Sequence, residues 1–173
     1  MTKRLAPALG SIAFFCAVPC VVAGLGPALV TDYEFESLPG AYAPLSVIGG
    51  ALIVAGLIAV VHSFARFVVE GLGTPAPVAP TERLVVGGLY RYVRNPMYLA
   101  VAAVIVGQLL LFGNLGLLAY AAVYVAAVAA FVRFYEEPTL RRQFGEQYDL
   151  YRDHVPAWLP RRSAWRPPPA SAV

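Results

Sequence analysis

Long stretches of this sequence contain no charged residue. The first of them, residues 5–30, runs for about 26 residues, and its apolar side chains follow one another instead of recurring at the spacing of an amphipathic helix or strand. Only 13% of the 173 residues are charged, whereas 59% are hydrophobic. Because a soluble domain of this size needs more charged surface, the pattern predicts an integral membrane protein.

Four apolar runs predict about four transmembrane helices, in residues 5–30, 45–69, 97–112 and 115–131. The third run is short for a full crossing, and Gly113-Asn114 predicts a turn that joins the last two runs into a helical hairpin. The alternative for the first run is a cleaved signal peptide, although the run exceeds the roughly 7 to 15 apolar residues of such peptides. The predicted fold class is an all-α membrane bundle.

The basic residues predict how the bundle is oriented. All thirteen Lys and Arg fall at the N-terminus, between the last turns of the second run and the start of the third, or after the fourth run. The first connector instead carries Asp32, Glu34 and Glu36 and no base. Because loops rich in Lys and Arg stay on the cytoplasmic side, we expect both termini there, which requires an even number of spans.

Composition argues against two classes of function. The net charge is +3, but the basic residues flank apolar runs and form no basic face for nucleic acid. Cys16 and Cys20 lie one helical turn apart with no further soft ligand nearby, and His62 and His154 are the only histidines. We therefore expect neither nucleic-acid binding nor a metal site.

The sequence around Pro96 is a candidate site for an anion. A proline in the first turn of a helix leaves the amides of the following residues unpaired at the helix start, where they attract negative charge. Arg94 would complement a carboxylate or phosphate there. Equally, Asn95 and Pro96 could start the helix while Arg94 meets lipid phosphate, and the spacing does not decide between these interpretations.

Glu136 and Glu137 form the second candidate site. They end a predicted transmembrane helix, where the helix dipole disfavours acids and where ionisable groups at membrane depth need a partner. A structural explanation is equally open, because Pro138 can begin a new helix in which both acids occupy favourable N-terminal positions.

An amphipathic segment follows these acids, in residues 138–155. Its apolar residues share one helical face: Leu140, Phe144, Tyr148 and Tyr151. This spacing predicts a surface helix that lies on the bundle or the lipid headgroups, and Gly145 can interrupt it.

Three separated motifs together resemble one superfamily. They are Arg94-Asn95-Pro96-Met97-Tyr98, Tyr135-Glu136-Glu137-Pro138, and Phe144-Gly145 with Tyr148, Tyr151, Val155-Pro156 and Leu159-Pro160. In this order and spacing they resemble the signature of the isoprenylcysteine carboxyl methyltransferase and phospholipid methyltransferase superfamily, over residues 71–160. The resemblance implies an all-helical membrane bundle that binds S-adenosylmethionine, the methyl donor, at the cytoplasmic ends of the last hairpin.

The resemblance also assigns roles to residues. Glu136 and Glu137 match paired acids implicated in cofactor binding and are the candidate catalytic residues. Gly71-Leu72-Gly73 is similar to a Gly-x-Gly element of phosphatidylethanolamine methyltransferases. The residues that the resemblance places in the cofactor site are Arg94, Asn95, Pro96, Tyr98, Glu136, Glu137, Tyr148 and Tyr151.

On this basis the chain divides into three parts. Residues 1–70 hold the first two transmembrane helices, and residues 71–160 form a methyltransferase region with the hairpin and the C-terminal helix. Residues 161–173 are expected to be a disordered, Pro-rich tail.

The sequence constrains the identity of the methyl acceptor less than that of the methyl donor. Asn95 stands where isoprenylcysteine enzymes have His, and Ala100 replaces a small Gly, so the pattern leans toward phospholipid-type enzymes. We expect a membrane lipid or another lipophilic small molecule as acceptor, and an amine acceptor must be kept unprotonated, which Glu136, Glu137 or His154 could do. The alternative function is non-enzymatic: a lipid-binding or transporter-associated membrane subunit whose charges contact headgroups.

Overall fold

The computed structural model describes residues 19–33, 40–70 and 83–167. Every regular element in these ranges is a helix and none is a strand, which confirms the predicted all-helical fold for this part of the chain. Gly71-Leu72-Gly73 lies outside the described residues, as do Glu34, Glu36 and the first part of the first apolar run.

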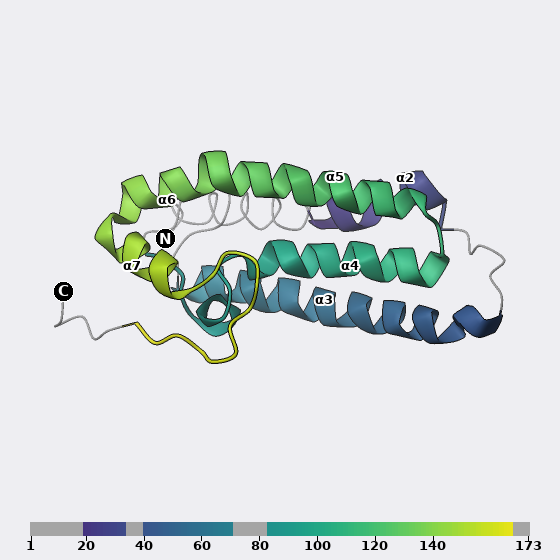
Figure 1. Cartoon of the computed structure of the whole chain (residues 1–173), viewed down its shortest axis with the longest axis horizontal. Helices are drawn as coiled ribbons and strands as arrows, with labels where there is room; N and C mark the ends of the chain where they lie inside the picture. Colours follow the sequence, from purple (N-terminus) through teal and green to yellow (C-terminus); the bar gives the residue numbers. More distant parts are fainter. Residues whose placement is uncertain (1–18, 34–39, 71–82, 168–173) are drawn as a thin grey trace, which may run out of the picture.

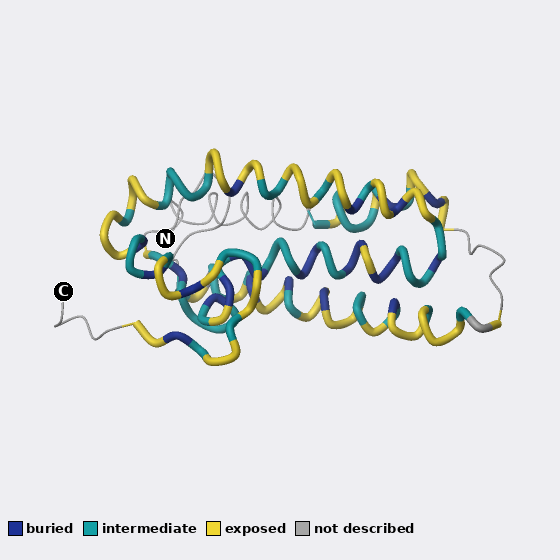
Figure 2. Tube along the Cα trace, in the orientation of Figure 1, coloured by how far each residue is buried: buried dark blue, intermediate teal, exposed yellow. Residues whose placement is uncertain are grey.

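Three long helices form the body of the fold and lie side by side (Figure 1): α3 (Ala43–Glu70), α4 (Pro96–Phe112) and α5 (Gly116–Phe131). α4 lies between the other two, and the short elements η1 (Val21–Leu25) and α2 (Gly26–Thr31) pack against α4 and α5. Figure 2 shows the consequence for solvent exposure, because α4 is mostly buried or intermediate while the outer faces of α3 and α5 are exposed.

One end of the bundle carries most of the remaining elements. α5 continues through a π-helical turn, η4 (Val132–Glu136), into α6 (Glu137–Phe144), and α7 (Glu146–His154) then turns back. The 3₁₀ turn η3 (Gly88–Arg91) precedes α4 at this end, and η2 (Gly40–Tyr42) precedes α3 at the other.

Two helical stretches are long and apolar enough to cross a membrane, Ala43–Phe67 and Gly116–Phe144. Val21–Thr31 and Pro96–Phe112 are apolar but shorter. Two of the predicted spans therefore reach full length in the described residues, and the count of four spans remains a prediction. The large exposed side chains on the outer faces of α3 and α5 are mainly apolar, and such a surface suits lipid better than water.

Glycines let α3 and α4 approach closely. A Cβ on Gly49 would lie 2.6 Å from the carbonyl oxygen of Gly107, and a Cβ on Gly107 would lie 2.7 Å from that of Gly49. Further along α3, a Cβ on Gly56 would lie 2.8 Å from the Ala100 oxygen. Because apolar helices in lipid gain little from hydrophobic burial, close contact at small residues is a main source of their packing energy.

A proline before the first connector releases two carbonyl groups, and side chains of the hairpin satisfy both. Pro27 has no N–H to donate to the oxygens of Val22 or Ala23, its partners in the π and α registers. Gln108 Nε2 donates to the Ala23 oxygen at 2.7 Å, and Tyr120 OH donates to the Val22 oxygen at 2.7 Å. Since backbone groups in lipid need partners, these bonds hold η1 and α2 on the hairpin.

Two glycines end helices where the sequence predicts breaks. Gly113 ends α4 in the left-handed region with a φ of 74°, and the Asn114 Oδ1 accepts a hydrogen bond from the Gly116 amide at 2.8 Å. Gly145, with a φ of 52°, divides the helix predicted over residues 138–155 into α6 and α7. A residue with a Cβ is strained at such positive φ, so these positions favour glycine.

α7 packs on the end of the bundle through an apolar cluster whose buried members are Tyr148, Tyr151, Val155 and Trp165. Trp165 belongs to residues 161–173, where we expected a disordered tail. Its amide donates to the Arg91 oxygen at 2.9 Å, and Arg91 Nε donates to the Trp165 oxygen at 2.7 Å. Residues 161–167 are thus held against the bundle because a large aromatic ring is buried there, while residues 168–173 lie outside the described part.

Gly49→Leu should destabilise the bundle by about 1–3 kcal/mol, as overpacking does. Gly50→Leu at the neighbouring position should cost much less, because a Cβ there meets no atom within 4 Å. Both changes raise helix propensity equally, so their difference reports the contact between α3 and α4. Thermal unfolding of the two variants in one detergent measures this difference, and equal losses would contradict the close approach.

Candidate active site

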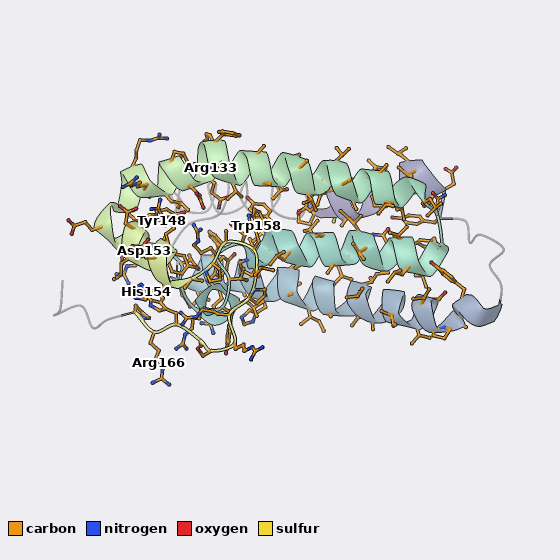
Figure 3. All side chains as sticks on the ribbon, in the orientation of Figure 1. Arg133, Tyr148, Asp153, His154, Trp158 and Arg166 are labelled. Carbon is orange, nitrogen blue, oxygen red and sulfur yellow. The ribbon has the colours of Figure 1, made fainter. Side chains whose placement is uncertain are left out.

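Three segments that are distant in the sequence meet at one end of the bundle (Figure 1). They are the residues that start α4, the junction of η4 with α6, and α7 with the chain that follows it. Figure 3 shows the nitrogen and oxygen atoms of side chains concentrated at this end. Five of the predicted site residues form hydrogen bonds there, in two groups: Arg94 with Glu137 and Tyr148, and Tyr98 with Glu136.

Arg94 makes the largest number of these contacts. Its Nη1 lies 2.7 Å from Glu137 Oε1 and donates to Tyr148 OH at 3.0 Å, and its Nε donates to the Val155 oxygen at 2.9 Å. The Arg94 and Glu137 side chains are only 12% and 16% exposed. A charge pair removed this far from water needs additional hydrogen bonds to be favourable, and Arg94 has them.

Glu136 has a different environment from its neighbour. Tyr98 OH donates to Glu136 Oε2 at 2.9 Å, and the backbone oxygen of Tyr98 accepts from Tyr124 OH at 3.1 Å. Within the described residues, no basic side chain lies close enough to form an ion pair with Glu136. In the described part of the chain, Glu137 is therefore paired with Arg94 and, at 3.9 Å, with Arg133, whereas Glu136 has a neutral hydroxyl donor.

The local sequence explains how both acids reach the site. In η4 the Glu137 amide donates to the Val132 oxygen five residues back, and Pro138, which has no N–H, follows at once. A π turn holds one more residue than an α turn, so it changes the helix face on which the following side chains lie. Glu137 also lies in the first turn of α6, so the structural and the functional explanations of these acids are compatible.

The two tyrosines of α7 remain protonated at neutral pH. Burial raises the pKa of both the Tyr148 and the Tyr151 hydroxyl, and the Arg94 charge lowers each pKa by a smaller amount. Tyr151 OH donates to the Tyr90 oxygen at 2.7 Å. Tyr148 OH accepts from Arg94, and its own proton has no acceptor within the described residues. Tyr148 is thus a spare donor at the site.

The remaining predicted site residues point elsewhere. Asn95 Nδ2 donates to the Ala157 oxygen at 3.2 Å, and Pro96 is the buried first residue of α4. Tyr151 is buried, with its ring 5.5 Å from that of Trp165. These residues hold the C-terminal segment against the start of α4, and their part in binding a cofactor remains a prediction.

Two contacts beside the site could not be foreseen from the sequence. Tyr124, from the middle of α5, reaches the backbone of Tyr98, and Arg91 exchanges hydrogen bonds with Trp165. A tyrosine within an apolar run and a tryptophan in a Pro-rich segment are their only signals in the sequence.

Removing one partner of the Arg94–Glu137 pair should destabilise the fold by about 2–3 kcal/mol, because the other charge stays largely buried without its partner. Arg94→Gln and Glu137→Gln should each lower the unfolding temperature, and the double variant should lose less than the sum of the two. Arg142→Gln, at an exposed position on α6, is the control. Thermal unfolding of the wild type, the two single variants and the double variant gives the coupling, and strictly additive losses would show that the charges do not act as a pair.

Comparison with known proteins bears on the same region. The sequence model of a family described as phospholipid methyltransferase matches residues 45–147, which is more than half of the chain. The matched range includes Arg94, Tyr98 and both glutamates. No curated protein and no solved structure gives a significant match. The match confirms the resemblance seen in the motifs, and the chain belongs to the phospholipid methyltransferase family.

Proposed function

We propose that this protein transfers the methyl group of S-adenosylmethionine to a lipid acceptor at the cytoplasmic face of the membrane. Membership of the family supports methyl transfer to a lipid, and the cofactor and the membrane face are inferred beyond it. One observation carries the proposal: Arg94, Glu137 and Tyr148 meet beside the Tyr98–Glu136 pair at one end of an apolar bundle.

The donors and acceptors at the site fit the charged groups of S-adenosylmethionine, which are a carboxylate, an ammonium and a sulfonium. Nη2 is the one guanidinium nitrogen of Arg94 without an acceptor within the described residues, and it can donate to a carboxylate. Tyr148 OH offers a second donor. Glu136 can receive a cation, because it forms no ion pair with the described part of the protein.

Methyl transfer requires little from the protein beyond positioning the methyl donor and the acceptor. When bound, S-adenosylmethionine supplies a methyl group on a positively charged sulfur, and the C–S bond breaks as the acceptor's lone pair forms a bond to the methyl carbon. The residues of the site hold donor and acceptor in line and exclude water. Glu136 takes the proton that an amine acceptor releases when its new C–N bond forms.

The positions of the arginines support the assignment of the site to the cytoplasmic face of the membrane. Every basic residue in the described ranges lies at the end of the bundle that carries the site, and the opposite end has Asp32 and no base. Positively charged segments next to membrane helices stay in the cytoplasm. This distribution of charge supports a site that faces the cytoplasm.

Binding of S-adenosylmethionine to the purified protein in detergent tests the proposal, followed by transfer of labelled methyl groups into a total membrane extract. We expect saturable binding and label in the lipid fraction. Glu136→Gln should lower cofactor binding or methyl transfer roughly ten-fold or more, because the attraction for a cation is lost. Its unfolding temperature should stay near that of the wild type, since Glu136 has no ion pair to lose in the described structure.

Arg142→Gln is the matched control for this experiment and should behave like the wild type. Absence of saturable binding by the wild-type protein would overturn the proposal. Binding and transfer that are unchanged in Glu136→Gln would remove Glu136 from the site.

A further inference from the structure

We infer that His62 and Arg66 on α3 form a subsite for the phosphate of the acceptor lipid, an inference that rests on the proposed function. The two residues lie one helical turn apart, near the end of α3 that contacts η3. No charged residue precedes them in α3, which begins at Ala43. Neither residue forms a hydrogen bond or ion pair with Arg94, Glu137 or Tyr148, which together we call the Arg94 group.

The protein holds both side chains in place. Arg66 Nη1 donates to Glu70 Oε1 at 2.8 Å, and Glu70 Oε2 accepts from the Gly87 amide at 2.8 Å. A Cβ on Gly88 would lie 2.5 Å from His62 Nε2 and 2.9 Å from Arg66 Nε, so the loop backbone fits closely against the pair. An arginine that only extends toward headgroups at a helix end needs no such support.

Arg66 keeps donors for an anion. Its side chain is 40% exposed, and its Nε and Nη2 have no acceptor within the described residues. His62 is exposed beside it. The Glu70 carboxylate uses both oxygens on Arg66 and the Gly87 amide, so it orients the guanidinium and leaves the second edge available. A planar guanidinium edge matches two oxygens of a phosphate.

The outer face of α3 indicates a lipid as the source of this phosphate. Four aliphatic side chains with exposed fractions of 58%, 51%, 65% and 65% lead along α3 to the pair: Val54, Leu57, Ile58 and Val61. Their spacing of three and four places them on one side of the helix together with His62. An acyl chain lying along this stripe would bring its phosphate to His62 and Arg66.

The position beside η3 suits an acceptor. The Phe67 ring lies edge-on to that of Tyr90, with centroids 5.4 Å apart, and the Tyr90 oxygen accepts from Tyr151 OH. Burial raises the pKa of the Tyr90 hydroxyl, and the Glu136 charge raises this pKa further. The Tyr90 hydroxyl therefore lies close enough to Glu136 for the two groups to interact electrostatically. The segment that packs against His62 and Arg66 thus also carries a side chain that the Glu136 charge affects.

Native mass spectrometry of the full chain tests the subsite. The protein in detergent is incubated with equal amounts of phosphatidylethanolamine and of diacylglycerol with the same acyl chains. Wild-type protein should retain the phospholipid preferentially, and Arg66→Gln should reduce this preference roughly ten-fold, because a charge-assisted phosphate contact is lost. Arg162→Gln, an exposed arginine outside the pair, is the matched control and should retain the preference.

A second variant guards against misfolding. Arg66→Gln leaves Glu70 without its cation, whereas Arg66→Gln with Glu70→Gln removes both charges and keeps an acceptor for the Gly87 amide. The inference is overturned if wild-type protein retains both lipids equally, or if both Arg66 variants keep the preference. Displacement of the phospholipid by millimolar inorganic phosphate would indicate a free-anion site and overturn the lipid assignment.

Cofactor binding separates this inference from the proposed function. Arg66→Gln should bind S-adenosylmethionine like the wild type, because Arg66 lies outside the Arg94 group. Loss of lipid preference with intact cofactor binding supports the subsite. Absence of cofactor binding in the wild type would count against the proposed function and not against the phosphate contact.

Discussion

The Arg94 guanidinium holds together the end of the bundle that carries the site. It joins the start of α4 to Glu137 beyond α5, and to Tyr148 and the Val155 carbonyl in and after α7. Taking a charged group out of water costs several kcal/mol, so the arrangement is favourable only when these bonds are made together. Each of the three segments therefore depends on the other two for its position.

The two π turns arise from the same constraint and have different consequences. Each ends two residues before a proline, and in each the amide before the proline bonds to a carbonyl five residues back. At Pro27 the released carbonyls accept from Gln108 and Tyr120, so the turn fastens one helix to the hairpin. At Pro138 the turn presents two acids to the site. A proline in an apolar helix thus supplies a packing contact in one place and functional groups in the other.

The helices could be predicted because their signals are local. The apolar run over residues 97–112 gives α4 to within one residue, and Gly113 and Gly145 mark the breaks after α4 and α6. The continuation of α5 into α6 could not be predicted from hydropathy, since charges begin at Arg133 although the helix goes on. The place of Trp165 depends on contacts with Arg91, which is 74 residues away in the sequence, and no local pattern encodes such a pairing.

The different partners of the two adjacent acids also lay beyond sequence reasoning, because the Arg94–Glu137 contact joins residues 43 apart. Had the chain neutralised both acids with its own arginines, a cationic ligand would have to break an ion pair before it could bind. Had it neutralised neither, the uncompensated charges would oppose the packing of α4 against the helix that carries them. In the described residues Glu137 is paired with Arg94 while Glu136 bonds to Tyr98, so the ion pair that joins the helices does not depend on Glu136, although the burial of Glu136 still carries a desolvation cost.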